Sequence, residues 1–370
     1  NDLDSSLLRS TAYSLTGRFE EAIELLCHML QWQVAQDEIY YHLGITYQGK
    51  GDFEEAITYY KKAIGLNMQN EAAILELSYC LEYLNRLEDL VPFYEQFIDQ
   101  DPYAHQAWFN LGEIHMRLDR YEEAIQAFEY ATLIKSDFER AFFYLGCAYL
   151  NLEKFQDAQA CFLNAVDLYD GDDPDLLCHL AATYEKLEQY EIAIKYYQRA
   201  IRANSTWDEG WYGVGVCLDA IDRWLEALHF LRKAKELDGN NANYWLAFAN
   251  IEYKIGHVLS SLEAYEKAAE LAPYNKEIWF NWSYLYYEQG NYEQAIDILE
   301  GIIDDMPEEA DLQYRLVAYL IEAGRYKEAF NHLENALLLD YDQHILLYEF
   351  FTELETQKAL YKIIEQYRHD

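Results

Sequence analysis

Apolar and polar positions along this chain recur with a period of 34 residues. Within each period, large apolar residues lie three, four and seven positions apart, which is the spacing of one face of an α-helix. In the stretch from Tyr40 to Ile64, two such stripes are separated by Gly51. Each period therefore predicts two helices of roughly three to four turns joined by a short turn. A period of this length indicates stacked helical hairpins rather than a closed globular core.

Ten repeats and a tail fit this register. The predicted domain covers residues 3–343, and a shorter segment, 344–370, is predicted to form C-terminal capping helices. One extra residue precedes Pro174, and Asp173 or the residue before it is expected to cap the following helix. The repeats are predicted to start at residues 3, 37, 71, 105, 139, 174, 208, 242, 276 and 310.

Small and turn-forming residues occupy fixed columns of the repeat. The eighth, twentieth and twenty-seventh positions are mostly Gly, Ala or Ser, which predicts close helix contacts where a larger residue would overpack. The third repeat differs, because it has Leu90 and Phe97 in such columns, and Pro92 predicts a kinked or delayed second helix. The fifteenth position holds residues that tolerate a left-handed helix end: Gly17, Gly51, Asn85, Asp119, Asp222, Gly256, Gly290 and Gly324.

The composition restricts the possible partners. Hydrophobic residues make up 51% of the chain, which excludes disorder, and the formal net charge is −38. This charge disfavours nucleic acid and anionic membrane surfaces as ligands, and it favours encounters with basic partners. No apolar run reaches the roughly 18 residues of a membrane helix. The six cysteines are interpreted as buried free thiols: Cys27, Cys80, Cys147, Cys161, Cys178 and Cys217.

The sequence offers no catalytic constellation. It has no phosphate-binding glycine loop, no GxSxG and no HExxH motif, and its ten histidines fall in different columns. The aspartates of residues 167–175 do not have the spacing of an EF-hand loop. We therefore expect no enzyme activity, no cofactor and no metal. A reducing, cytoplasmic location is expected from the cysteines. The chain begins at Asn1 without a methionine, which leaves open a removed leader peptide or further repeats.

The column pattern resembles the tetratricopeptide repeat over nearly the whole chain, as in bacterial proteins composed almost wholly of such units. The fourth repeat fits best, with an aromatic residue, Leu-Gly, Ala, an aromatic residue and Ala at positions 4, 7–8, 20, 24 and 27: Trp108, Leu111, Gly112, Ala124, Phe128 and Ala131. The resemblance implies an all-α fold, an α-α superhelix or solenoid. It also implies that the first helix of each repeat lines a concave groove.

The resemblance further implies a non-catalytic protein–protein interaction scaffold that binds a peptide or helix of a partner. The groove columns are aromatic and acidic, so we expect a partner with basic and apolar residues. The chaperone-binding members use lysine at the fifth position, and this chain has none there. The expected groove contacts are Tyr41, Tyr79, Glu82, Phe109, Glu113, Phe143, Tyr212, Asp219, Tyr253, Phe280, Tyr284 and Tyr287.

Three alternatives stay open at this point. The chain can be the recruitment arm of a larger enzyme whose catalytic domain lies outside this sequence. It can be a co-chaperone-like adaptor, which the missing lysines disfavour. It can also form a homo-oligomer through exposed repeat ends.

Overall fold

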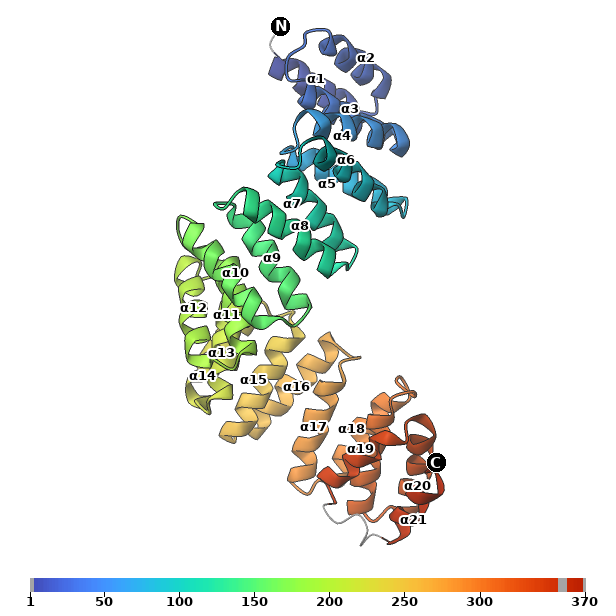
Figure 1. Cartoon of the computed structure of the whole chain (residues 1–370). Helices are drawn as coiled ribbons and strands as arrows, with labels where there is room; N and C mark the ends of the chain where they lie inside the picture. The colour runs from blue at the N-terminus through green and yellow to red at the C-terminus, as the bar shows by residue number, and fades with distance from the viewer. Residues whose placement is uncertain (1–2, 352–357, 369–370) are drawn as a thin grey trace. The chain divides into compact units, whose positions relative to one another are not determined.

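The computed structural model describes residues 3–351 and 358–368, and the secondary structure assigned within these ranges is helical. The chain forms two compact units, Asn1–Leu187 and Glu188–Asp370, which are described separately. Figure 1 shows successive helices of each unit as hairpins stacked in chain order. This arrangement confirms the predicted all-α repeat fold.

The N-terminal unit begins with five hairpins. Each helix packs mainly on its neighbours in the sequence, and first helices of adjoining repeats also touch, as α7 and α9 do. The bounds are α1 Leu3–Leu15, α2 Phe19–Leu30, α3 Gln36–Lys50, α4 Phe53–Leu66, α5 Glu71–Tyr83, η1 Leu87–Asp89, α6 Leu90–Gln100, α7 His105–Arg117, α8 Tyr121–Ile134, α9 Glu139–Asn151, α10 Phe155–Leu168 and α11 Pro174–Lys186.

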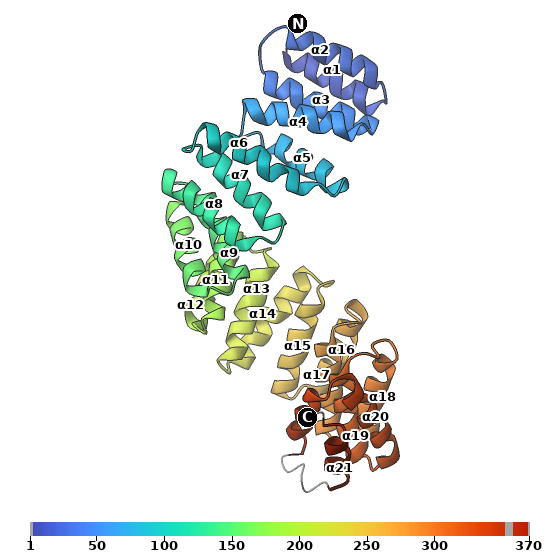
Figure 2. The ribbon, with the colours of Figure 1, turned by 45° about the vertical axis from the view of Figure 1, so that its right-hand side comes forward.

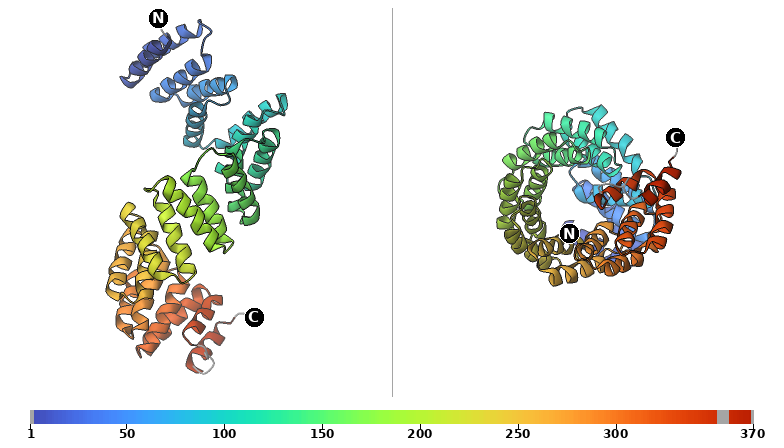
Figure 3. Two further views of the ribbon diagram at one scale, coloured as in Figure 1. Left: turned by 90° about the vertical axis from the view of Figure 1, so that its left-hand side faces the viewer. Right: turned by 90° about the horizontal axis from the view of Figure 1, so that it is seen from below.

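The C-terminal unit continues the same pattern, and its successive hairpins are also visible in the views of Figure 3. The bounds are α12 Tyr190–Ala203, α13 Asp208–Ala220, α14 Trp224–Leu237, α15 Ala242–Ile255, α16 Val258–Leu271, α17 Lys276–Glu288, α18 Tyr292–Ile303, α19 Ala310–Glu322, α20 Tyr326–Leu339, η2 Asp342–Glu349 and α21 Lys358–Gln366. The division into ten repeats with the starts given above remains an interpretation of the sequence.

The small-residue columns mark the closest contacts between the two helices of a hairpin. A Cβ atom added to Gly112 would lie 2.6 Å from Cε1 of Phe128, and one added to Gly146 would lie 2.7 Å from Cε1 of Phe162. Ala124 is fully buried. The aromatic ring at position 24 therefore lies against the backbone of position 8, which explains why both columns are restricted.

Each hairpin turn needs one residue in the left-handed region. Every residue predicted at the fifteenth position has a positive φ, from 54° at Asn85 to 95° at Gly256. Glu153 and Glu188 also have positive φ values, of 56° and 58°. Sequence reasoning missed these two, because glutamate carries none of the local preference for this conformation that Gly, Asn and Asp have.

Tryptophans at the fourth position connect the first helix to the loop before it. The indole Nε1 of each donates a hydrogen bond to a carbonyl six residues earlier: Trp108 to Pro102 at 3.0 Å, Trp211 to Ser205 at 3.0 Å, Trp245 to Gly239 at 2.8 Å and Trp279 to Pro273 at 2.8 Å. Each of these four indoles therefore combines apolar packing with a contact to the preceding loop.

The irregular third repeat follows the sequence prediction of a delayed helix. A 3-10 turn, Leu87–Asp89, precedes α6, which begins only at Leu90. Pro92 lies in the first turn of α6, where its missing N–H breaks no hydrogen bond. The expected cap of α11 is also present, because the side chain of Asp173 accepts hydrogen bonds from the amides of Asp175 and Leu176 at 2.9 and 3.4 Å.

The tail was predicted to form capping helices from residue 344. Its described part contains the 3-10 helix Asp342–Glu349 and the α-helix Lys358–Gln366. Residues 352–357 of the predicted capping helices lie outside the described residues. The expectation that all six cysteines are buried needs correction, because Cys27 is exposed and Cys147 is half-buried.

Candidate functional site

A hollow of about 420 Å³ lies on the N-terminal unit, on the face formed by the first helices of successive repeats. We call this surface the first-helix face. We call it the α5–α9 hollow, because its walls come from α5, α7 and α9, which follow one another in Figure 2. It is lined by Glu71, Ala72, Ile74, Leu75, Ser78, Gln106, Phe109, Asn110, Glu113, Ile114, Arg117 and Arg140.

The apolar part of this hollow has an open rim and a closed floor. Leu75 lies on the rim with 66% of its surface exposed, and Tyr79, one turn further along α5, is 54% exposed. Phe109 forms part of the floor and is only 1% exposed. Its ring packs 5.0 Å from that of Phe138 and 5.6 Å from that of Tyr144. Phe109 was expected to be accessible to a partner, but its ring is buried in the hydrophobic core.

Two arginines flank the hollow, and each already has a carboxylate partner. Arg140 pairs with Glu71, and its guanidinium carbon lies 5.2 Å from the centre of the Phe109 ring. Arg117 pairs with Glu82. Glu82 was expected as a contact for a basic partner, so such a partner would have to compete with Arg117. Sequence reasoning overlooked both arginines, although Arg117 is at position 13 and Arg140 at position 2 of a repeat, both on first helices that line the expected groove.

Glu113 is the remaining charged residue of the lining. It is half-buried, and its carboxyl group forms no hydrogen bond and no ion pair with any residue in the described part of the chain. The pKa of Glu113 is raised to about 7, mainly by burial and also by the neighbouring Glu71, while Arg140 and Arg117 oppose the rise. This carboxyl group therefore changes its charge near neutral pH.

Two buried hydroxyl groups near Glu113 also lack partners among the described residues. Ser78 is one of the lining residues and is 1% exposed, and its Oγ has no hydrogen bond among the described residues. The hydroxyl of Tyr94 is likewise buried and without a hydrogen bond. By contrast, Asn110 is satisfied, since it accepts from Gln106 at 2.9 Å and donates to the Met68 carbonyl at 3.3 Å. Buried polar groups usually have partners, so the Ser78 hydroxyl is an exception within the lining of the hollow.

Other expected contacts of the N-terminal unit lie outside this hollow. Phe143 lines a separate hollow of about 210 Å³ between α9 and α11, where its ring lies 5.0 Å from that of His179. Tyr41 is half-buried on α3, with its ring 6.1 Å from that of Tyr60. The structure therefore brings only Phe109 and Glu113 of the predicted set together in the α5–α9 hollow, with Tyr79 and Glu82 beside it.

Some of the expected contact residues on α13 and α15 of the C-terminal unit already interact with other residues of the chain. Tyr212 and Asp219 line a hollow of about 200 Å³ along α13, α15 and α17. Asp219 pairs with Lys254 at 2.5 Å, and the hydroxyl of Tyr253 donates to Glu288. These carboxylates are less available to a basic partner than their positions in the sequence suggested.

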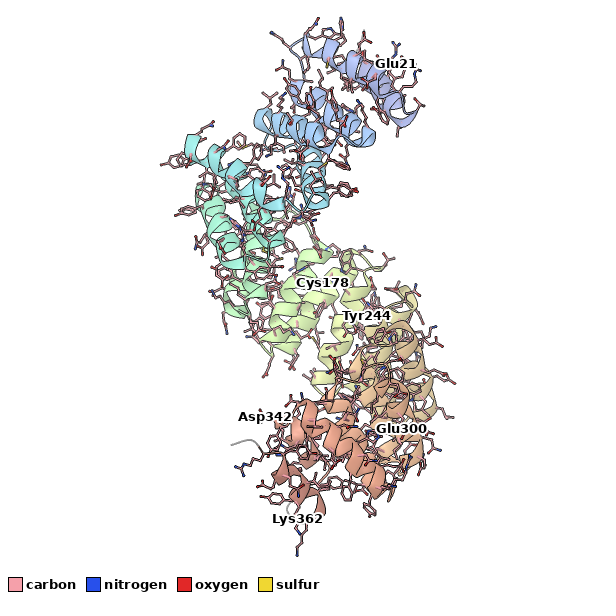
Figure 4. All side chains as sticks on the ribbon, turned by 90° about the vertical axis from the view of Figure 1, so that its right-hand side faces the viewer. Glu21, Cys178, Tyr244, Glu300, Asp342 and Lys362 are labelled. Atoms are coloured by element: carbon pink, nitrogen blue, oxygen red, sulfur yellow. The ribbon has the colours of Figure 1, made fainter. Side chains whose placement is uncertain are left out.

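The chain's own tail covers part of the expected surface on α17. Phe280 lines a hollow of about 420 Å³ with residues of η2, whose first residue, Asp342, is labelled in Figure 4. Phe350, just after η2, packs edge-on against Tyr287 at 5.3 Å. The guanidinium carbon of Arg315 lies 4.5 Å from the Phe280 ring centre and 5.5 Å from that of Phe350.

Tyr284 lies beside this covered region. It is 36% exposed, and its hydroxyl donates to Glu288 at 2.8 Å. The sequence could not show that residues after η2 would fold back onto this face, because nothing in the repeat columns describes the tail.

Among the described residues, no group of three or more His, Cys, Asp or Glu side chains is arranged to hold a metal ion. None of the described helices has the length and apolar character needed to cross a membrane.

Parts of this chain are similar to proteins of known structure. Among curated proteins, none matches the sequence. A crystal structure described as "YrrB: a TPR protein with an unusual peptide-binding site" is 22% identical, with a TM-score of 0.43 over 50% of this chain and 95% of its own. MamA (41-end) from Desulfovibrio magneticus RS-1 is 18% identical, with a TM-score of 0.43 over 46% of this chain and 96% of its own.

The family assignment rests on the sequence matches themselves. Patterns of the tetratricopeptide repeat match residues 38–67, 91–137, 139–172, 174–206 and 260–319, which together make up more than half of the chain. The chain therefore belongs to the tetratricopeptide repeat family.

Proposed function

We propose that this protein is a non-catalytic interaction scaffold that binds a segment of a partner protein along its first-helix face. The observation that carries the proposal is the α5–α9 hollow with its uncovered apolar rim. Leu75 and Tyr79 expose most of their surface beside a hollow large enough for a side chain. An apolar anchor of the partner would bury this rim, and such contacts supply most of the affinity of peptide complexes.

The partner segment is proposed to carry basic residues in addition to apolar anchors. The net charge of −38 attracts cations over long distances and raises association rates at low salt. Aromatic faces such as Tyr79 add a favourable surface for Lys or Arg. The carboxylates that already pair with Arg117 or Lys254 contribute less to this attraction than unpaired ones.

The test uses a random peptide library displayed on phage and selected on the full chain. Affinities of the selected peptides are then measured for Leu75→Ala and for Leu133→Ala. Leu133 is a matched control, because it is 79% exposed and lies on α8, the second helix of its hairpin. We expect Leu75→Ala to weaken binding about tenfold or more and Leu133→Ala to leave it unchanged.

The opposite outcomes would overturn the proposal. If the selected peptides bind Leu75→Ala and Tyr79→Ala with the affinity of the unaltered chain, the first-helix face at α5 is not the binding surface. If Leu133→Ala alone reduces the affinity, the face formed by the second helices binds the peptides instead.

A further inference from the structure

The α5–α9 hollow contains one carboxyl group that lacks an ion-pair partner, whereas both of its arginines form ion pairs. Arg140 pairs with Glu71 and Arg117 pairs with Glu82. Glu113 has no hydrogen bond and no ion pair among the described residues, although burial removes much of the hydration of its carboxyl group. A half-buried carboxylate without a donor is costly, so the missing complement of this hollow is a hydrogen-bond donor with positive charge.

Ser78 gives a second, independent indication of a ligand. Ser78 lines the same hollow, and its hydroxyl is almost completely buried and has no partner in the described residues. An ammonium group carries three donors and no acceptor, so it can donate to a carboxylate and a hydroxyl oxygen together. A guanidinium group would gain most from a flat aromatic surface, but Arg140 already lies over the Phe109 ring.

The walls of the hollow can accommodate the aliphatic part of a lysine side chain. Leu75, Ile74 and Ile114 are apolar, and Leu75 stands exposed at the rim. The four methylene groups of a lysine can lie along such a wall while the head group reaches the polar interior.

We infer that the α5–α9 hollow accepts one lysine side chain of the bound segment, with its ammonium group on Glu113 and Ser78 and its stem along Leu75. This inference rests on the proposed function, because it names the anchor of the segment that the first-helix face binds. It makes Glu113 and Ser78 the residues that select lysine over neutral or acidic side chains.

Lysine binding at this position is coupled to pH. The groups that face Glu113 are Glu71 from α5, Tyr94 from α6, Arg117 from its own helix α7, and Arg140 and Tyr144 from α9. Burial raises the pKa of both tyrosines above their ordinary value, so neither titrates near neutral pH. Glu113 must lose its proton to hold an ammonium group, and its pKa is raised to about 7 in the free protein. Affinity is therefore expected to fall about tenfold from pH 8 to pH 6.

The probes for the test are small amides rather than an unknown partner. Nα-acetyl-lysine methylamide, its Nε-acetylated analogue and Nα-acetyl-glutamate methylamide are titrated against the full chain by ligand-observed NMR at pH 8 and pH 6. The lysine probe should bind in the millimolar range, and acetylation of its amine should weaken binding about tenfold or more, because the charge-assisted hydrogen bonds are lost.

Single substitutions identify which residues bind the lysine probe. Glu113→Gln keeps the shape and should weaken the lysine probe about tenfold and abolish its pH dependence. Glu122→Gln removes the same charge from an exposed position on α8 and should change neither. Ser78→Ala should weaken the lysine probe severalfold, while its thermal unfolding midpoint should not decrease, since an unpartnered buried hydroxyl is removed.

Three results would overturn the inference: no binding of the lysine probe, equal binding of its acetylated analogue, or unchanged binding by Glu113→Gln. Stronger binding of the glutamate probe would instead assign the hollow to carboxylates held by Arg117 and Arg140. None of these results bears on the selected peptides and Leu75→Ala, so failure of the lysine site can be distinguished from failure of the first-helix face.

Discussion

At the scale of single residues, Glu113 links stability to pH. Its pKa is raised to about 7, mainly by burial, from the ordinary value of 4.5 that it has in an unfolded chain. Its contribution to stability is therefore complete below pH 4.5 and is lost as the pH rises through 7. Glu113→Gln cannot titrate, so it should gain ~2 kcal/mol relative to the unaltered chain between pH 5 and pH 8. Urea unfolding at both pH values measures this difference, and Glu122→Gln should show none.

A second prediction at this scale concerns the contact between Gly112 and Phe128. Gly112→Ala would place a Cβ 2.6 Å from a fully buried ring, and we expect a loss of ~1–3 kcal/mol from overpacking. Gly301 is the matched control, because it lies in α18 with no atom within 4 Å of an added Cβ. Gly301→Ala should instead stabilise by ~0.5–1 kcal/mol. Equal effects of the two substitutions in urea unfolding would refute the close contact.

At the scale of helices, most of the secondary structure could be predicted from the columns of the repeat. The positive φ of Asn85 and the delayed start of α6 before Pro92 follow from local backbone chemistry. The positive φ of Glu153 follows from its place at position 15 and not from its residue type. The packing of the tail on α17 does not follow from the repeat columns. The candidate site was predictable only in part for the same reason, since burial of Phe109 by Tyr144 is decided between repeats.

The cap of α11 gives a prediction at this scale. Asp173→Ala removes the acceptor for the amides of Asp175 and Leu176, which should cost ~1 kcal/mol and speed amide exchange in the first turn of α11. Asp170→Ala removes an exposed carboxylate from the same loop and serves as the control. If both substitutions leave exchange in α11 unchanged, the cap contributes nothing measurable.

At the scale of the whole molecule, the charge of −38 should control how quickly a partner arrives rather than how long it stays. Screening is effective beyond about 10 Å at about 0.1 M salt. For a basic peptide selected on the full chain, added salt should therefore lower the association rate much more than it raises the dissociation rate. Stopped-flow measurements at two salt concentrations separate the rates, and a rate of association independent of salt would argue against a basic partner.

The central claim is that partners bind the first-helix face of the N-terminal unit. The most direct test is amide hydrogen exchange of the full chain with and without a selected peptide, because nearest-neighbour packing keeps the protection local. Protection should rise in α5, α7 and α9, with α8 and α10 unchanged. Protection confined to α8 and α10, or absent from α5 and α7, would contradict it.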